Sequence, residues 1–196
     1  MFIVIEGMDG SGKSTISKTL SEKLNAELVS TPGHQFKDIR KPLDTIFSQN
    51  TKARQLFYAA TVLNVSDEIK LLTESGQHVV TDRYWLSTQV YHNWMSNGEH
   101  LNLHDVECEL LTPDLTVYLE LPLNERHKRI SARNNNTRED IQTLTPEATD
   151  TLHNLYLNMR NSRAVGHWLQ IDASKKIELI VDTIMAKLRE LEVTAI

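Results

Sequence analysis

A short stretch near the start of the chain, residues 5–15 (IEGMDGSGKST), combines closely spaced glycines with one lysine and two hydroxyl residues. Residues 7–14 fit the pattern G-x-x-x-x-G-K-[ST] without a mismatch. In such a loop the glycines let successive backbone N–H groups turn toward phosphate oxygens. Lys13 then reaches the terminal phosphates, and the Ser14 hydroxyl binds Mg²⁺. The pattern therefore predicts a nucleoside triphosphate site, with ATP as the expected ligand.

The context of this loop is the one that triphosphate binding requires. An apolar strand precedes it, and a helix with an apolar face follows it. Asp9 is not part of the phosphate-binding pattern, so it either caps a turn or reaches toward a hydroxyl of a second substrate. The residues predicted to bind the triphosphate are Gly7, Asp9, Gly10, Ser11, Gly12, Lys13, Ser14 and Thr15.

A second group of polar side chains follows another apolar strand, in the stretch VVTDRYWLSTQVYHNW (residues 79–94). Asp82 stands where this strand meets its loop, as expected of a carboxylate that holds Mg²⁺ directly or through water. Arg83 can fork onto an acceptor phosphate, although an Asp–Arg pair that closes the strand end explains both residues equally. Ser87 and Tyr91 share a face of the next helix, and packing alone would also account for Tyr91.

The segment 133–145 (RNNNTREDIQTLT) is polar and has no apolar stripe. It is either a solvated loop or a mobile lid that carries Arg133 and Arg138 to a phosphate. Its position in the sequence does not decide between the two.

Five apolar runs predict buried strands at residues 2–5, 27–30, 78–81, 115–119 and 168–171. Helical patterns lie between them, and the last begins after Ser174, its expected N-cap. Strands that alternate with helices indicate an α/β fold with a parallel sheet covered on both faces. Functional residues are then expected at the carboxyl ends of the strands.

Composition bounds the function classes. The 196 residues carry a net charge of −5, which argues against a protein that coats polymeric nucleic acid. Cys108 is the only cysteine, which suits a reducing, cytoplasmic compartment. No apolar run approaches the roughly 20 residues that span a bilayer, and no secretory signal is evident, so no membrane association is expected. We expect one domain over residues 1–196, with a lid near 133–145.

Four ordered stretches resemble the thymidylate kinase family in its bacterial form: residues 2–15, 56–62 (LFYAATV), 81–92 and 113–134 (PDLTVYLELPLNERHKRISARN). The resemblance implies a P-loop NTPase fold with a five-stranded parallel sheet flanked by helices on both faces. It also implies a homodimer and Mg²⁺-dependent transfer of the ATP γ-phosphate to dTMP.

The resemblance also implies individual roles. Asp9 would approach the 3′-hydroxyl of the acceptor sugar, and Arg83 would clamp its 5′-phosphate. Phe57 would stack on the base, and Tyr91 would fill the space that a 2′-hydroxyl needs. The two lid arginines, Arg133 and Arg138, would close on the transferring phosphate. Further substrate contacts are expected at Pro32, Thr61, Ser87 and Thr88.

The chain departs from that family at positions that read the base. Residues 30–33 (STPG) stand where the family has Arg-Glu-Pro-Gly, and Thr61 replaces an arginine that donates to O4 of the pyrimidine. His92 replaces a glutamine, and Val90 a small alanine. Three alternatives therefore stay open: a kinase for another or modified pyrimidine monophosphate, a nucleoside kinase, and a non-catalytic nucleotide-binding module.

Overall fold

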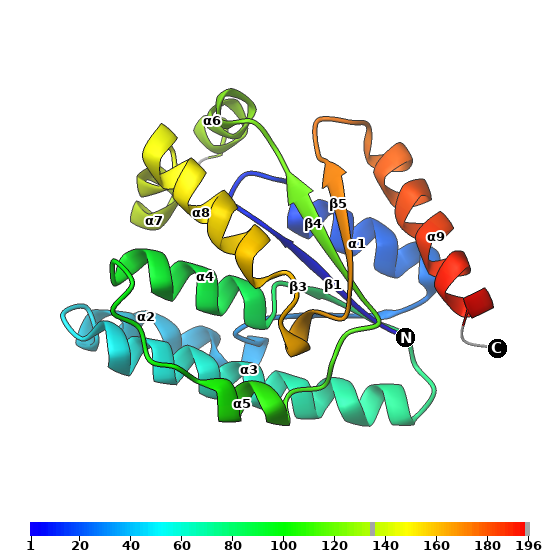
Figure 1. Ribbon diagram of the computed structural model, residues 1–196, viewed down its shortest axis with the longest axis horizontal. Coiled ribbons are helices and arrows are strands. Elements are labelled where there is room, and N and C mark those ends of the chain that lie inside the picture. Colours follow the sequence, from blue (N-terminus) through cyan, green and yellow to red (C-terminus); the bar gives the residue numbers. More distant parts are fainter. Residues whose placement is uncertain (134–135, 195–196) are drawn as a thin grey trace.

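The structure is a computed structural model that describes residues 1–133 and 136–194. Five strands form one parallel sheet in the order β2-β3-β1-β4-β5 (Figure 1). This confirms the predicted α/β fold with a five-stranded parallel sheet. The strands are β1 (Phe2–Gly7), β2 (Glu27–Ser30), β3 (Val79–Asp82), β4 (Leu115–Glu120) and β5 (His167–Asp172).

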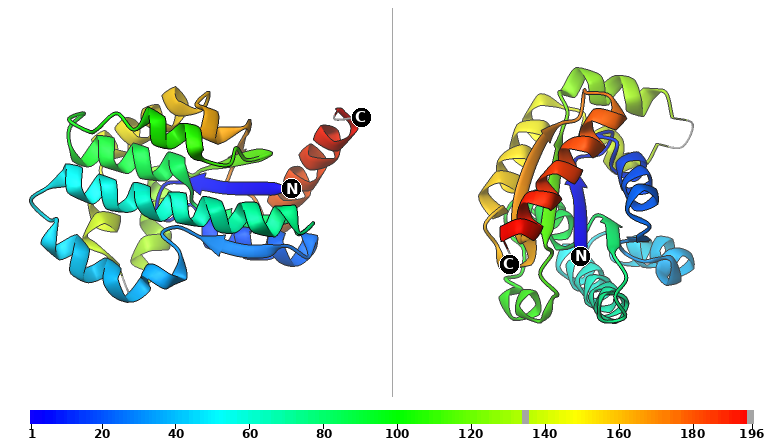
Figure 2. Two further views of the ribbon diagram at one scale, coloured as in Figure 1. Left: turned by 90° about the horizontal axis from the view of Figure 1, so that it is seen from below. Right: turned by 90° about the vertical axis from the view of Figure 1, so that its right-hand side faces the viewer.

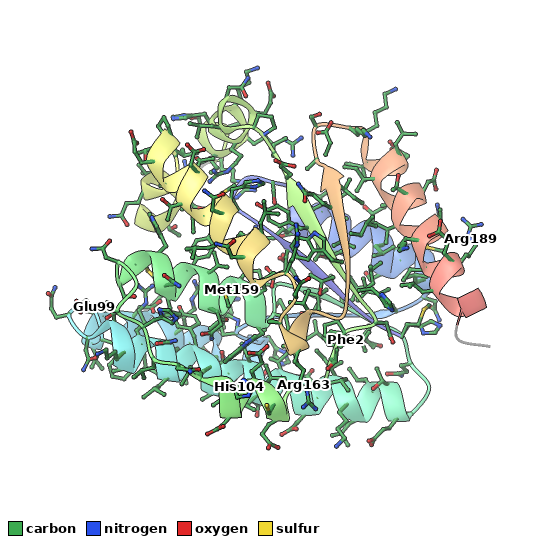
Figure 3. The ribbon with its side chains drawn as sticks, viewed as in Figure 1. Phe2, Glu99, His104, Met159, Arg163 and Arg189 are labelled. Atoms are coloured by element: carbon green, nitrogen blue, oxygen red, sulfur yellow. The ribbon has the colours of Figure 1, made fainter. Side chains whose placement is uncertain are left out.

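Helices cover both faces of the sheet because alternate residues of each central strand are apolar on either side. On one face, Ile3 and Ile5 of β1 pack against α1 and α9. On the other face, Phe2 and Val4 pack with α3 and α5, and α4 and α8 complete that layer (Figures 1 and 2). Figure 3 shows the layer of side chains around Phe2, whereas Arg189 projects from the outer side of α9.

The helix bounds are α1 (Lys13–Leu24), α2 (Lys37–Ile46), α3 (Thr51–Glu74), α4 (Trp85–Met95), α5 (His104–Glu109), α6 (Leu123–Ser131), α7 (Arg138–Gln142), α8 (Pro146–Met159) and α9 (Ile177–Thr194). Two short 3-10 turns, η1 (His34–Phe36) and η2 (Arg163–Val165), precede α2 and β5. In the described part of the chain, no helix is both long and apolar enough to cross a membrane.

Two expectations about local structure need correction. The last helix, α9, begins at Ile177, and Ser174 lies outside it with its hydroxyl donated to Asp172 Oδ1 at 2.6 Å. Ser174 therefore closes the turn after β5 rather than capping the helix. The polar segment 133–145 contains the short helix α7, so it is not loop throughout.

Parallel pairing brings the functional loops to one edge of the sheet. Ile5 of β1 and Ser30 of β2 both lie in register with Asp82 of β3, so the loops after these strands begin side by side. Gly7 ends β1 with φ +145°, and a Cβ there would lie 2.7 Å from the Leu119 carbonyl oxygen. Only glycine lets the chain turn here while it passes so close to β4.

Candidate active site

The loop between β1 and α1 leads directly into the N-terminus of that helix. Gly12 lies just before α1 with φ 99° and no side-chain cap, so the first N–H groups of the helix point outward with the positive end of its dipole. Lys13 folds back over the loop, where its Nζ donates to the Met8 carbonyl at 3.0 Å and lies 3.9 Å from Asp9 Oδ1. Burial, together with the nearby positive charge of Arg83, lowers the pKa of Lys13 to about 8.

Ser14 and Asp82 form a ready pair of oxygen ligands. The Ser14 hydroxyl donates to Asp82 Oδ2 at 2.5 Å. Asp82 Oδ1 is sealed from solvent and has no hydrogen-bond partner among the described residues. Mg²⁺ prefers hydroxyl and carboxylate oxygens and is usually held by only one or two protein groups, so this donor set fits it.

Asp9 lies at the centre of a charged cluster. Arg83 NH2 donates to its Oδ1, and the Tyr91 hydroxyl donates to its Oδ2 at 2.6 Å. Burial by itself would raise the pKa of Asp9, but the charges of Arg83 and Lys13 outweigh it and hold that pKa well below its ordinary value. Asp9 is therefore a carboxylate that orients its neighbours and is a weak base.

A cavity of about 300 Å³ opens beside this cluster, between the carboxyl ends of the strands and α2, α3 and α4. Asp9 and Arg83 line it, and Lys13 lies next to Asp9, so the cavity adjoins the phosphate-binding loop. Its other walls are apolar at Pro32 and Met95 and basic at Arg40 and Arg54. An elongated polar molecule with an anionic end matches this shape and charge.

A second cavity of about 230 Å³ lies on the other side of the loop. Gly10 and Gly12 line it together with Arg133 and the turn at Ala173. Arg129 spans this cavity, with donor distances of 3.1 Å to the Ser11 carbonyl and 2.9 Å to the Ala173 carbonyl. The phosphate-binding loop thus separates two cavities, as a transfer between two bound molecules requires.

Comparison with known proteins gives one consistent family. The sequence model of the family "Thymidylate kinase" matches residues 5–184. The chain belongs to the thymidylate kinase family. It is 34% identical over 190 residues to a probable thymidylate kinase of Methanococcus maripaludis, covering 94% of this chain and 92% of that one. It is also 31% identical over 205 residues to the thymidylate kinase of Plasmodium falciparum, covering 98% and 91%.

Solved structures of low sequence identity support the same fold. A deoxyadenosine kinase from M. mycoides, with the products dCMP and dCDP bound, superposes with a TM-score of 0.66. It is 21% identical and the match covers 97% of this chain and 100% of that one. At this identity the likeness concerns the α/β kinase fold.

The structure brings most of the acceptor residues implied by the thymidylate kinase family into one cavity. Those that line it are Asp9, Pro32, Arg83, Ser87, Thr88 and Tyr91. Tyr91 lies over the Arg83 guanidinium, 5.1 Å from ring centroid to carbon, and its hydroxyl touches Asp9.

The structure does not bring the two expected base contacts on α3, Phe57 and Thr61, to this cavity. Thr61 is fully buried and donates its hydroxyl to the Tyr58 carbonyl at 2.7 Å. Phe57 packs edge-on against Phe36, with ring centroids 6.3 Å apart. Tyr58, next to Phe57 in the sequence, lines the cavity from α3 together with Arg54.

The lid arginines are only partly described. Arg133 is exposed and lines the second cavity, beside the phosphate-binding loop. Arg138 is the first residue of α7, and its side chain lies outside the described part of the chain. Thr137 and Asp140, from the same segment, line the first cavity. The segment 133–145 therefore borders both cavities.

Sequence reasoning missed Glu6, which anchors the acceptor side of the site. Glu6 is fully buried on β1 and accepts hydrogen bonds from the backbone N–H groups of Tyr84 and Ser87 and from the Ser87 hydroxyl. Arg83 NH1 donates to that same hydroxyl at 3.0 Å, so Glu6 positions Arg83 through Ser87. The signal available in the sequence was a charged residue directly between the apolar run 2–5 and Gly7.

Arg126 was also missed. It lies on α6, is fully buried, and donates to the Asp9 carbonyl at 2.8 Å. Its guanidinium also donates to Thr143 Oγ1 at 2.8 Å and Thr149 Oγ1 at 3.1 Å. One side chain thus ties the phosphate-binding loop to the end of the lid segment and to α8. Its position three residues before Arg129 gave no sequence signal for burial.

Proposed function

We propose that this chain transfers the γ-phosphate of ATP to the 5′-phosphate of a deoxypyrimidine nucleotide, with dTMP as the preferred acceptor and dTDP as the product. The observation that carries the proposal is the Asp9–Arg83–Tyr91 cluster, which lies in a cavity directly beside Lys13. The relatives named as thymidylate kinases, aligned over nearly their full length, support the choice of acceptor.

The proposed reaction needs alignment and charge neutralisation more than a base. An oxygen of the acceptor phosphate, already an anion, attacks the γ-phosphorus, and the bond from that phosphorus to the β–γ bridging oxygen breaks to release ADP. Arg83 binds the acceptor phosphate by paired N–H donors. Lys13 and the loop N–H groups hold the β- and γ-phosphates, and Arg133 and Arg138 add positive charge from the lid segment.

The metal site is part of this proposal. Ser14 and Asp82 would hold Mg²⁺, because the Ser14 hydroxyl lies beside a carboxylate whose other oxygen, Oδ1, has no partner among the described residues. A Mg²⁺ ion held by these two residues would supply positive charge to offset the charge that develops on the phosphates during transfer.

Two observations argue against a nucleoside kinase, which must remove a proton from a 5′-hydroxyl. Among the residues that the structure describes, two carboxylates line the cavity, Asp9 and Asp140. Asp9 has a pKa far below neutrality because its cationic neighbours outweigh its burial. Asp140 accepts from the Thr137 N–H and hydroxyl, both at 2.8 Å. Neither is arranged as a general base.

The test is ADP release from ATP and Mg²⁺ with a panel of acceptors: dTMP, dUMP, dCMP, 5-hydroxymethylated pyrimidine monophosphates, ribonucleotides and thymidine. The highest kcat/KM is expected with dTMP, and Lys13→Ala is expected to lose most turnover while staying folded. A better rate with thymidine would favour a nucleoside kinase. No acceptor-dependent ADP release would leave a nucleotide-binding module.

We further propose that the chain acts as a homodimer in a cytoplasmic, reducing setting. Exposed apolar side chains occur on both α2 and α3: Ile39, Ile46, Leu56 and Leu71. Large apolar side chains exposed on a folded chain favour association with a second chain. Cys108, the single cysteine, fits a compartment without disulfides.

A further inference from the structure

The end of the acceptor cavity between α3 and α4 is formed by two helical faces. Thr88, His92 and Met95 follow one another along α4 with helical spacing and all line the cavity. Arg54 and Tyr58 line it from α3. Asp9, Arg83 and Tyr91 hold the phosphate and sugar in the proposed function, so the far edge of a bound base meets these two faces.

His92 is a polar group on this wall whose Nδ1 has no hydrogen-bond partner within the described part of the chain. It is 4% exposed, and its Nδ1 is sealed from solvent with no partner among the described residues. Its ring lies 5.4 Å from the Tyr58 ring, tilted by 49°. Burial, and then the charge of Arg54, lowers the pKa of His92 to about 3, so the imidazole is neutral at physiological pH.

The position of the remaining proton follows from the sealed nitrogen. A neutral imidazole carries one N–H and one lone pair. A buried N–H without an acceptor is rarer and costlier than a buried acceptor without a donor. Nδ1 therefore carries the lone pair and Nε2 the proton. Because Nδ1 is sealed from solvent while the ring lines the cavity, we infer that the Nε2–H faces the cavity.

A donor is needed at this wall because Thr61 cannot supply it. The Thr61 hydroxyl is buried and already donates to the Tyr58 carbonyl. A thymine or uracil base places a carbonyl oxygen at position 4, opposite the sugar, whereas cytosine places an amino donor there. A hydrogen-bond donor at the far wall favours the carbonyl oxygen of thymine or uracil and disfavours the amino group of cytosine.

We propose that His92 is a specificity-determining residue whose Nε2–H donates to the carbonyl oxygen at position 4 of the pyrimidine, so that it selects thymine and uracil against cytosine. This rests on the proposed function, because it assumes a pyrimidine monophosphate in this cavity. Arg54 lines the same wall, where it is already paired with Asp44 Oδ1 at 2.9 Å, so the contact is assigned to His92.

The experiment compares His92→Leu with His92→Gln. Leucine fills a similar volume without a donor, whereas glutamine keeps an N–H and is the matched control. Steady-state kinetics are measured with dTMP, dCMP and the deoxynucleotide of 5-methyl-2-pyrimidinone, which lacks the oxygen at position 4. H92L is expected to lower kcat/KM for dTMP about 10- to 100-fold, largely through KM, with kcat changed less than about threefold.

Selectivity separates recognition from a merely structural role. Wild type and H92Q are expected to prefer dTMP about 10- to 100-fold over the analogue that lacks the oxygen at position 4. H92L is expected to lose this preference, and also the preference for dTMP over dCMP. Unchanged preferences in H92L overturn the proposal. If kcat/KM of the wild type is less than twofold lower for the analogue than for dTMP, the proposal is overturned, whether or not H92L folds. If wild type turns over no pyrimidine monophosphate, the proposed function fails instead.

Discussion

Lys13 must carry a proton to bind phosphate, and burial beside Arg83 lowers its pKa to about 8 in the free protein. Triphosphate oxygens raise that pKa, so above pH 8 binding must take up a proton. The affinity for ATP is therefore expected to be flat below pH 7.5 and to fall about tenfold for each pH unit above 8. Titration calorimetry between pH 6.5 and 9.5, in buffers of different ionisation enthalpy, measures both the affinity and the proton uptake.

Lys13→Arg is the matched control for this pH effect. Its guanidinium stays charged over the whole range, so the slope above pH 8 is expected to disappear, whatever the absolute affinity. An equal slope in both proteins would assign the effect to another group.

Glu6 carries a second titration effect at the scale of one residue. Burial raises its pKa, against the hydrogen bonds from Ser87 and Tyr84 that favour the charged form. The unfolded chain then releases this proton at lower pH than the folded one, so the contribution of Glu6 to stability falls as pH rises between the two pKa values. Each unit by which the pKa is raised corresponds to about 1.4 kcal/mol.

Glu6→Gln removes the ionisation and keeps an acceptor for the backbone N–H groups. The free energy of unfolding of this variant, minus that of wild type, is expected to increase between pH 4.5 and pH 8 in urea titrations. Because Ser87 loses its charged partner, KM for the acceptor is expected to rise about three- to tenfold with kcat little changed. A pH-independent difference in stability would contradict the raised pKa.

At the scale of elements, α6 controls how the lid segment is attached. Arg126→Met keeps the apolar stem of the side chain but leaves Thr143 and Thr149 without their donor. The free energy of unfolding is expected to fall by about 2 kcal/mol, because buried acceptors lose their partners. Hydrogen exchange of backbone amides at residues 136–145 is expected to speed up, since the end of the segment loses its tie to the loop.

Arg129→Met provides the comparison for this prediction. Arg129 also lies on α6, but its hydrogen bonds go to Ser11 and Ala173 and not to the lid segment. Faster exchange at residues 136–145 in both variants would mean that the loss of any α6 arginine loosens the segment.

The order of elements and the phosphate-binding loop could be predicted because each depends on local sequence. The apolar runs placed all five strands within two residues of their ends, and the glycines and Lys13 defined the loop. Contacts between distant residues could not be predicted. Glu6 meets Ser87 81 positions away, and Arg126 meets Asp9 117 positions away. Which side chains of α3 line the cavity could not be predicted for a related reason, since the orientation of a helix depends on packing that no local pattern records.

At the scale of the whole molecule, the proposed homodimer can be tested at the exposed surface of α2 and α3. Ile46 and Leu71 are each 69% exposed on α2 and α3. If these helices form the interface, the double variant Ile46→Asp, Leu71→Asp adds two carboxylates to it from each chain and is expected to be monomeric. Leu179→Asp, at a site 55% exposed on α9, is the control, because α9 packs on the opposite face of the sheet.

Sedimentation velocity at about 10 μM distinguishes the outcomes. A dimeric wild type and L179D with a monomeric double variant would place the interface on α2 and α3. A dimeric double variant would place it elsewhere, and a monomeric wild type would refute the dimer itself. Arg40, Arg54 and Tyr58 line the acceptor cavity from these same two helices. A monomeric double variant is therefore also expected to raise KM for dTMP, because α2 and α3 lose the contact that holds them.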